Sequence, residues 1–319
     1  MYKTVNTYLK EKYGYKIYKI ALNGGFTCPN RDGTLDTRGC IFCSGYGSGD
    51  FAEDSALSIS EQIERGKARI RSKMGNIMVK NSTVGNATSE NATAGNSMAG
   101  NVTARYIAYF QAFTNTYAPV SRLRELFMEA AENPDILILS IATRPDCLGD
   151  EVVELLKEIN QIKPVWVELG LQTIHEKSAK YIRRGYPLSV YDEAVIKLNQ
   201  INVDVITHVI LGLPGETHED IIETVKYVCN QNIQGIKLQL LHVLKGTDLA
   251  KDYESGLFEC MSLEEYTDLV AECISLIPED IIIHRMTGDG AKKDLIAPLW
   301  SADKKRVLNT LNRKLSLLT

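Results

Sequence analysis

The chain alternates between short apolar runs and longer segments of helical periodicity. Runs rich in β-branched and aromatic residues predict strands, and apolar residues spaced three and four apart predict the helices between them. The predicted strands are residues 15–22, 105–112, 136–143, 165–171, 203–213 and 235–244. The predicted helices are residues 58–74, 120–132, 149–160, 174–184 with 190–201, and 216–230. Six βα units in succession follow from this order.

Repeated βα units predict an α/β fold around a parallel sheet. Strands joined by helices pair in parallel and are buried on both faces, so six units favour a partial (β/α)6 barrel similar to a TIM barrel. Functional groups in such a fold lie on loops at the carboxyl ends of the strands. Residues 1–250 are the predicted core, and residues 251–319 are a predicted small α+β extension with helices at 262–277 and 301–315 and a strand at 281–284.

One segment of the predicted core does not follow this pattern. Residues 75–104 are dominated by Asn, Gly, Ser, Thr and Ala, and the dipeptide Gly-Asn recurs. Without apolar periodicity such a stretch cannot offset its chain entropy by burial. We therefore expect a flexible surface insertion between the first long helix and the second strand.

Composition narrows the class of protein. The 319 residues include 36 basic and 40 acidic side chains, for a net charge of −4, and 44% are apolar, which is typical of a soluble globular chain. This balance excludes nucleic-acid binding by bulk charge, although a local basic groove remains compatible with it. The longest apolar run, residues 136–142, is too short to cross a bilayer, and the first residues contain no apolar secretory signal. We expect a cytoplasmic protein without membrane contact.

Three cysteines carry the strongest chemical signal. Cys28, Cys40 and Cys43 are spaced C-x11-C-x2-C in the loop after the first predicted strand. Thiolates bind soft metals, and a structural zinc site needs four ligands, whereas a four-iron cluster held by three cysteines leaves one iron open. No cysteine or histidine lies between Cys43 and Cys147 to supply a local fourth ligand. The spacing favours the cluster, and a remote histidine that closes a zinc site is the alternative, in a binding or regulatory protein.

With this loop and six βα units, the chain resembles the radical S-adenosylmethionine (SAM) superfamily. Further motifs are TRPD at 143–146, ELGLQ at 168–172, RG at 184–185 and HVILGLPGE at 208–216. Together with YFQAFTNT at 109–116, LHVLKGT at 241–247 and HRMTGDG at 284–290, they resemble the bacterial YhcC-like proteins over nearly the whole chain. The long first gap is similar to that of the radical domain of the Elongator catalytic subunit.

The resemblance implies a barrel of the radical SAM type and two cofactors, a [4Fe-4S] cluster on Cys28, Cys40 and Cys43 and SAM on its open iron. It implies an enzyme that cleaves SAM reductively to start radical chemistry, with a one-electron donor such as flavodoxin or ferredoxin. The substrate is unknown. The relation to Elongator suggests a nucleoside in transfer RNA, and a basic C-terminal helix is compatible with RNA, although a solvated helix face is the simpler interpretation.

Polar residues near the predicted strand ends are the candidates for SAM contacts. They are Gln111, Thr114, Thr143, Arg144, Glu168, Gln172, Arg184 and His208. By the two-residue period of a strand, Glu168 and Gln172 share a face. The alternative for Glu168 is a buried structural carboxylate paired with Arg144 or Arg184, and the alternative for His208 is a satisfied core histidine.

Cys147 follows the TRPD motif and is a candidate hydrogen donor or radical partner. The remaining cysteines, Cys229, Cys260 and Cys273, fall on or beside predicted helices, where packing is the simplest role.

Overall fold

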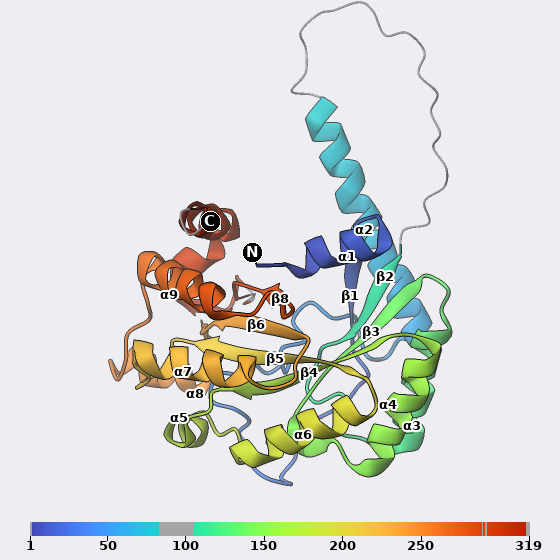
Figure 1. Cartoon of the computed structure of the whole chain (residues 1–319), viewed down its shortest axis with the longest axis horizontal. Helices are drawn as coiled ribbons and strands as arrows, with labels where there is room; N and C mark the ends of the chain where they lie inside the picture. Colours follow the sequence, from blue (N-terminus) through green and yellow to red (C-terminus); the bar gives the residue numbers. More distant parts are fainter. Residues whose placement is uncertain (1, 83–104, 289, 291, 317–319) are drawn as a thin grey trace, which may run out of the picture.

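A curled parallel sheet forms the centre of the computed structural model, which describes residues 2–82, 105–288, 290 and 292–316 (Figure 1). The sheet has seven strands in the order β1-β2-β3-β4-β5-β6-β8, and every neighbouring pair is parallel. The strands are β1 (Tyr18–Leu22), β2 (Tyr106–Phe110), β3 (Ile136–Thr143), β4 (Val165–Gln172), β5 (Asp204–Leu211), β6 (Gly235–Leu240) and β8 (Ile282–Arg285). A separate antiparallel pair joins β7 (Val243–Leu244) to β9 (Leu295–Ala297).

Helices cover the outer, convex face of this sheet (Figure 1). They are α2 (Ile59–Ser82), α3 (Val120–Glu132), α4 (Asp150–Ile162), α6 (Leu188–Gln200), α7 (His218–Cys229) and α9 (Leu263–Leu276). The others are α1 (Val5–Tyr13), α5 (Glu176–Tyr181), α8 (Asp248–Glu254), α10 (Lys304–Leu315) and 3-10 turns at Pro145–Cys147 and Leu299–Ala302. Within the described ranges, none of these helices is both long enough and apolar enough to pass through a bilayer.

The six predicted strands are all present in the sheet. The strand predicted at 281–284 also joins it, as β8 beside β6, so the sheet has seven strands and the C-terminal segment contributes one of them. Its residues Ile282 and Ile283 are buried, which explains why this strand completes the core. The single strand predicted at 235–244 is wrong in its second half, where the chain breaks after Leu240 and forms β7.

The boundary of the predicted insertion also differs. Helix α2 continues to Ser82, so residues 75–82 are helical where a loop was expected. The remainder of the predicted insertion, residues 83–104, lies outside the described residues, and the expectation of a flexible loop there stays a prediction.

The inside of the half-barrel is layered, because side chains two residues apart on a strand point to the same face. At the amino ends of the strands, Ile107, Ile138, Trp166 and Ile206 form an apolar layer, closed from below by Leu9 of α1. Sequence patterns did not predict α1. It is held at the edge of the sheet, where Thr4 pairs with Ile283 and the Ile283 N–H donates to the Lys3 carbonyl. The apolar layer therefore fills the inside at the amino ends of the strands.

Candidate functional site

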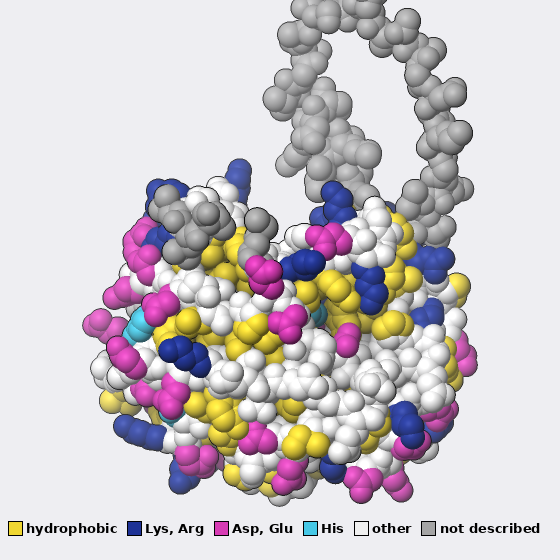
Figure 2. Space-filling view, in the orientation of Figure 1, with side chains coloured by type: hydrophobic (Ala, Val, Ile, Leu, Met, Phe, Trp, Pro, Cys, Tyr) yellow, Lys and Arg dark blue, Asp and Glu magenta, His cyan; other side chains and the backbone are white. Residues whose placement is uncertain are grey.

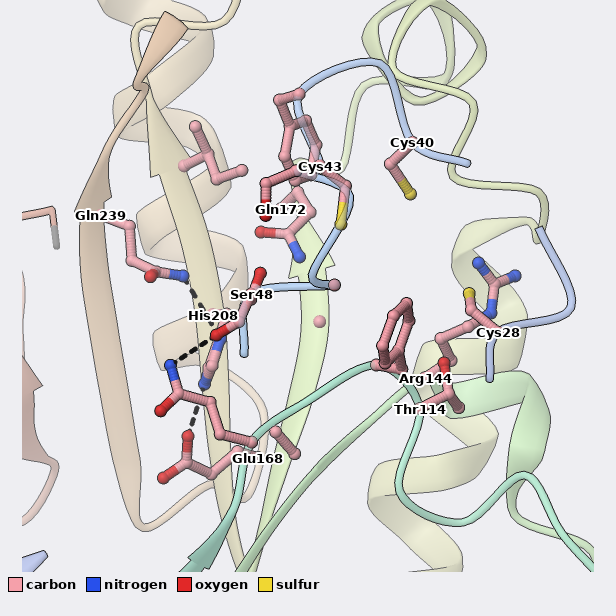
Figure 3. A pocket seen from close by; sticks show the side chains of 18 of the residues that line it. Cys28, Cys40, Cys43, Ser48, Thr114, Arg144, Glu168, Gln172, His208 and Gln239 are labelled. Carbon is pink, nitrogen blue, oxygen red and sulfur yellow. Dashed lines mark hydrogen bonds and ion pairs between the residues drawn. The ribbon is translucent and has the colours of Figure 1, made fainter. Parts of the chain in front are cut away.

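A cavity of about 250 Å³ lies at the carboxyl ends of the strands. It is lined by all three cysteines of the predicted cluster motif, as Figure 3 shows from close by. The eight candidate residues for SAM contacts also line it, namely Gln111, Thr114, Thr143, Arg144, Glu168, Gln172, Arg184 and His208. The fold thus brings together residues that are up to 180 positions apart in the chain.

Cys147 does not line this cavity. It contributes to a second one, of about 580 Å³, together with Pro29, Leu35 and Tyr117. Burial, and then the neighbouring Asp146, raise the pKa of the Cys147 thiol to about 12. Cys147, at the Pro145–Cys147 turn, therefore lies outside the cavity lined by the three cysteines, and its role as a hydrogen donor or radical partner stays a prediction.

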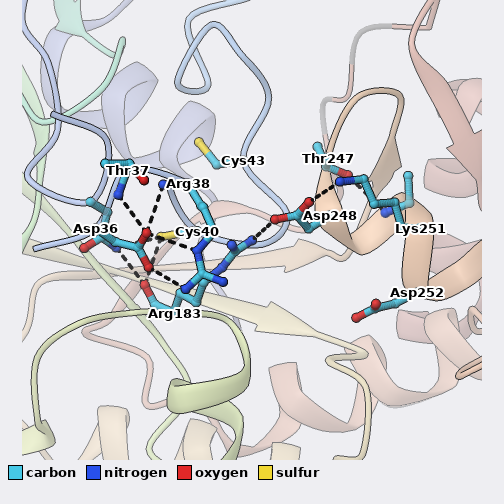
Figure 4. Close-up of polar contacts among 12 residues, drawn as sticks. Asp36, Thr37, Arg38, Cys40, Cys43, Arg183, Thr247, Asp248, Lys251 and Asp252 are labelled. Atoms are coloured by element: carbon cyan, nitrogen blue, oxygen red, sulfur yellow. Dashed lines mark hydrogen bonds and ion pairs between the residues drawn. The ribbon is translucent and has the colours of Figure 1, made fainter. Parts of the chain in front are cut away.

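The cysteine loop is fixed between the α5–α6 connection and α8. The Ile41 N–H donates to the Ile182 carbonyl at 3.2 Å, and the Ile41 carbonyl accepts the Leu249 N–H at 3.0 Å. Asn30 donates to the Arg183 carbonyl at 2.7 Å, and its Nδ2 lies 3.5 Å from the Cys40 sulfur. The Arg183 guanidinium in turn pairs with Asp248 at 2.8 Å, which adds an ionic link across the same junction (Figure 4).

A second set of contacts holds the loop against the end of β2. Arg31 donates to the carbonyls of Cys43 and Ser44 at 2.9 and 2.7 Å. The Gly47 carbonyl accepts the Phe113 N–H at 2.8 Å, and the Ser48 carbonyl accepts the Gln111 amide at 2.8 Å. In this structure the Gln111 side chain therefore supports the cysteine loop.

The three thiols are free and partly buried. Burial, and then repulsion from Cys43, raise the pKa of Cys40 to about 12, and burial also raises the pKa of Cys43. Because thiolates and not thiols bind metals, a metal bound by these cysteines would displace their protons.

The sulfurs of Cys28, Cys40 and Cys43 do not all lie within 4.8 Å of one another. A tetrahedral zinc ion with Zn–S bonds of about 2.3 Å holds its sulfurs about 3.8 Å apart. Among the described residues, three candidate ligand atoms lie within 4.8 Å of one another only at His175, Asp220 and Glu223. There the Asp220 carboxylate already accepts the Thr217 N–H at the start of α7. The cysteine sulfurs are thus spread wider than one zinc ion requires.

Two buried arginines lie close to the ring of Tyr186. Arg144 makes a bidentate pair with Asp146 at 2.9 and 2.7 Å, and its guanidinium lies 5.1 Å from the Tyr186 ring centre. Arg184 lies 4.8 Å from the same ring centre and donates to backbone carbonyls, including that of Thr173 at 2.6 Å. Neither arginine pairs with Glu168, so the suggested Glu168–Arg144 and Glu168–Arg184 pairs are wrong.

The remaining candidates differ in how far their polar groups are already used. The Thr143 hydroxyl bonds the Thr116 hydroxyl at 2.5 Å, and the Thr114 N–H donates to the Thr27 carbonyl. Gln172 has a left-handed backbone, with φ of +73°, and its buried Oε1 has no hydrogen-bond partner among the described residues. A strained residue with an unused acceptor is typical of a binding position.

Glu168 is the centre of a polar layer between the apolar layer and the cavity. Its fully buried carboxylate accepts from Lys19 at 3.1 Å, Ser140 at 2.6 Å, His208 at 2.9 Å and, at the same oxygen as His208, from Lys237. Burial alone would raise the pKa of Glu168, but the charges of Lys19 and Lys237 and the bond from His208 hold that pKa well below its usual range. A saturated carboxylate of this kind orients its neighbours.

From Glu168 a hydrogen-bonded chain runs through His208 to Gln239 (Figure 3) and on to Arg285, which also lines the cavity. His208 Nε2 lies 2.9 Å from Glu168, His208 Nδ1 lies 3.3 Å from Gln239 Nε2, and Gln239 Oε1 lies 3.2 Å from Arg285 Nη1. Arginine can only donate and a carboxylate can only accept, so the two ends fix the direction of every bond between them. Burial, and then Lys237, lower the pKa of His208 to about 4, in agreement with a neutral ring that donates through Nε2.

Sequence reasoning found Glu168 and His208 but missed Lys19, Lys237, Gln239 and Arg285. A signal for two of them was present. Lys237 and Gln239 lie two residues apart in a run that is otherwise apolar, which places both on one face of the strand.

Comparison with known proteins identifies the family. Residues 98–228 match the model of the radical SAM superfamily, and residues 233–316 match that of the radical SAM C-terminal domain. Protein YtqA of Bacillus subtilis is 43% identical over 314 residues, which cover 98% of this chain and 89% of that protein. The chain belongs to the radical SAM superfamily.

Other similarities agree with this radical SAM assignment. Protein YhcC of Escherichia coli is 35% identical over 318 residues, which cover 98% of this chain and 93% of YhcC. Elongator complex protein 3 of Schizosaccharomyces pombe is 28% identical over 180 residues, 55% of this chain and 31% of that protein. The solved structure of the archaeal Methanocaldococcus infernus Elp3 shares the fold, with a TM-score of 0.63 and 15% identity over 93% of this chain and 63% of that chain. The chain is thus a radical SAM enzyme by family, and membership implies a [4Fe-4S] cluster and SAM.

Proposed function

We propose that Cys28, Cys40 and Cys43 hold a [4Fe-4S] cluster and that the adjoining cavity binds SAM for reductive cleavage. The observation that carries this proposal is the convergence of three free thiols on one cavity of a radical SAM half-barrel. When bound, the reduced cluster supplies one electron to SAM, which yields methionine and a 5′-deoxyadenosyl radical. A donor such as flavodoxin or ferredoxin would deliver that electron.

The donor set of this site fits such a cluster. Three thiols supply three iron ligands, and their spread exceeds what one zinc ion requires. Arg31 and Asn30 hold the loop through its backbone and beside the Cys40 sulfur, so the loop is shaped before metal arrives. This arrangement favours the cluster over the zinc alternative.

Two side chains have the chemistry to bind SAM directly. Gln172 offers a buried acceptor that no described residue uses, which suits an ammonium or a ribose hydroxyl. Arg184 Nη2 has no hydrogen-bond partner among the described residues, and its nearest carboxylate oxygen, on Glu176, is 3.8 Å away. A guanidinium donor at the cavity wall suits the SAM carboxylate.

The other candidates then act as supports. Arg144 is fixed by Asp146 and Tyr186 near Cys28 and Cys40, where its charge balances that of a thiolate-bound cluster. Thr143 and Thr114 shape the wall through their bonds to neighbouring residues. Glu168 and His208 orient the opposite wall. Closure of the half-barrel at its amino ends keeps water from the interior, as radical chemistry requires.

The test is anaerobic reconstitution of the full chain with iron and sulfide. We expect about four iron atoms per chain, the absorbance of a four-iron cluster, and 5′-deoxyadenosine on addition of SAM and a reductant. A reconstituted four-iron protein that never forms 5′-deoxyadenosine would contradict the proposal. So would a protein that binds one zinc ion and no iron.

For the substrate, a nucleoside in transfer RNA is the class we propose to test first. It is supported by 28% identity over 154 residues to a tRNA uridine(34) acetyltransferase of Dehalococcoides mccartyi, which covers 47% of this chain and 33% of that protein. Basic side chains are interspersed with acidic ones on the face drawn in Figure 2, and Lys314 of α10 pairs with Glu264 and Asp268 of α9. RNA would therefore be recognised locally, which co-purification from anaerobic lysate followed by nucleoside analysis can test.

A further inference from the structure

The cavity is small for the molecules that the proposed function brings to it. Its volume is about 250 Å³. A pocket that encloses one drug-sized ligand usually measures roughly 300–1,000 Å³. A cavity of this size that takes SAM has little room for a second whole molecule. Most of a large substrate must therefore lie outside, against the residues around the opening, and reach in with only its reacting part.

Two segments from opposite ends of the sheet meet at this opening, which we call the mouth of the cavity. The sheet begins with β1 and ends with β8. The segments that follow these two strands both line the cavity, through Gly47 after β1 and through Gly288 and Gly290 after β8. Where the segments meet, the Lys293 ammonium lies 5.8 Å from the centre of the Tyr46 ring. A substrate that enters between them passes this pair.

The Tyr46 ring is presented to solvent on a fixed backbone. The Gly47 N–H donates to the Ser44 carbonyl at 3.0 Å, and the Gly49 N–H donates to the Tyr46 carbonyl at 2.8 Å, so two turns in succession hold this residue. Tyr46 is nevertheless 61% exposed, and a Cβ added to Gly45 beside it would meet nothing within 4 Å. An aromatic ring held in this way can stack on a flat partner at a small cost in conformational entropy.

Lys293 brings positive charge to the same place. The Lys245 N–H donates to the Asp294 carbonyl at 2.8 Å, which fixes the backbone beside Lys293 just before β9. Lys292 and Lys293 are both exposed. Within the described part of the chain, Lys293 has the Tyr46 ring, and no carboxylate, as its partner. A ring beside an ammonium matches a nucleic acid strand, since every base has a flat face and every nucleotide has a negatively charged phosphate.

We propose that Tyr46 and Lys293 bind a single-stranded segment of an RNA substrate, with an unpaired base stacked on Tyr46 and a neighbouring phosphate at Lys293. This inference rests on the proposed function and deepens it, because it names residues that hold the RNA outside the cavity. A strand suits the small cavity, since one nucleoside can enter while its neighbours stay at the mouth. The net charge of −4 agrees with recognition at one place and not by bulk charge.

The experiment measures RNA binding by fluorescence anisotropy, with the full-length, iron-reconstituted chain kept anaerobic in the presence of SAM. The probe is a fluorescein-labelled single strand of about ten uridines, within the range of lengths that single-strand binding proteins cover. Unlabelled total transfer RNA is the competitor. We expect Tyr46→Ala to weaken binding at least about fivefold, because one stacked base is lost. Tyr46→Phe keeps the ring and should retain the affinity.

The dependence on salt separates the two residues. Lys293→Ala removes one phosphate contact, so the slope of log affinity against log salt concentration should become shallower by about 0.7, the value for one phosphate of a single strand. Tyr46→Ala should lower the affinity at every salt concentration and leave the slope unchanged. A residue that only maintains the shape of the loop would not divide the two effects in this way.

Two variants serve as matched controls. Phe51→Ala removes another exposed ring of the cysteine loop, at a residue whose carbonyl accepts a hydrogen bond from Arg69 of α2. Lys157→Ala removes an exposed lysine that pairs with Glu154 on α4. Neither control should change the affinity for the probe or its salt dependence. Thermal unfolding of each variant confirms that the fold is retained.

The inference is overturned if the wild-type chain does not bind the probe, or if Tyr46→Ala and Lys293→Ala bind it as the wild type does. It is also overturned if Phe51→Ala weakens binding as much as Tyr46→Ala. Reduction of the cluster by flavodoxin is measured as well. If Tyr46→Ala slows that reduction and leaves RNA binding unchanged, the mouth receives a protein electron donor and the inference is wrong.

Iron content and 5′-deoxyadenosine formation by the wild type are recorded in the same preparations. A wild type that cleaves SAM but does not bind the RNA refutes this inference and leaves the proposed SAM cleavage intact. A wild type that binds the RNA through Tyr46 and Lys293 but never cleaves SAM refutes the proposed cleavage instead.

Discussion

The two ends of the cavity are built in contrasting ways. The cysteines lie on a long loop after β1 that is held by backbone hydrogen bonds such as those of Ile41. The opposite end consists of side chains within β4, β5, β6 and β8, linked to each other by hydrogen bonds. Groups on strands are held more rigidly than groups on loops. The proposed metal ligands thus lie on a loop, whereas the polar layer around Glu168 is fixed within the strands.

The largest effect on the difference between the two ends is expected when one cysteine of the loop is removed. Cys28→Ala, Cys40→Ala or Cys43→Ala should each abolish cluster binding, with iron falling from about four atoms per chain to background, because a cluster held by three cysteines cannot spare one. Iron analysis after reconstitution measures this. Cys260→Ala, a partly buried thiol outside the cavity, is the control and should keep its iron. Full iron loading in any of the first three would refute the ligand assignment.

Substitutions in the polar layer around Glu168, at the end of the cavity formed by strands, should lower the free energy of unfolding. Glu168→Gln removes the carboxylate that compensates Lys19 and Lys237, and breaking such a buried pair costs about 3–5 kcal/mol. Lys237→Met should cost less, because Glu168 retains Lys19, Ser140 and His208. Urea unfolding of both variants gives the order. If Lys237→Met is the more damaging change, Glu168 is not the centre of the polar layer.

Low pH should lower the stability of the folded protein through His208, at the same end of the cavity. The pKa of His208 is lowered to about 4 in the folded protein, so between its ordinary value of 6.5 and about 4 the unfolded chain binds a proton that the folded chain does not. Stability is therefore lost as pH falls through this window, by up to about 3 kcal/mol from His208. The loss should be smaller in His208→Gln, though not absent, because burial also lowers the pKa of His284. An unchanged pH dependence in that variant would show that His208 is not buried as a neutral ring.

A smaller effect is expected from the shape of the loop. Gly47 has φ of +55°, and a Cβ there would come within 2.3 Å of the Phe113 ring. Gly47→Ala should destabilise the ordered conformation of the cysteine loop by about 1–2 kcal/mol. The apparent iron affinity should therefore fall by about tenfold. Gly45→Ala is the matched control two residues away, with no positive φ and open space around its added methyl group. Equal iron affinity in the two variants would show that Phe113 does not hold the loop.

The sequence predicted the parts of this structure that depend on local pattern. Strand β3 and helix α3 were predicted to the residue, because their apolar residues follow one clear period. Helix α1 was missed because only Leu9 within it is buried, so its apolar pattern is weak. Strand β8 was found, but its place beside β6 depends on a contact between distant segments that no local pattern records.

The candidate site shows the same division. The cysteines and the residues lining the cavity could be chosen from motifs and strand ends, and all but Cys147 face the cavity. The partners of Glu168 could not be predicted in this way. They come from four other strands, and the order of the strands around the half-barrel determines which side chains are in contact; these partners are Lys19, Ser140, His208 and Lys237. The sequence suggested Arg144 or Arg184 as the partner of Glu168, whereas in the structure Glu168 pairs with two lysines, Lys19 and Lys237.

The pairing of Thr4 with Ile283 has a consequence for the making of the protein. A chain emerging from the ribosome exposes α1 and the first strands long before residue 283 has been synthesised. Until that late strand arrives, the partner of Thr4 at the edge of the sheet is missing, and so is His284, whose ring packs against Trp166. The edge of the sheet at Thr4 is therefore completed only after residue 283 has been synthesised, although Thr4 is among the first residues made.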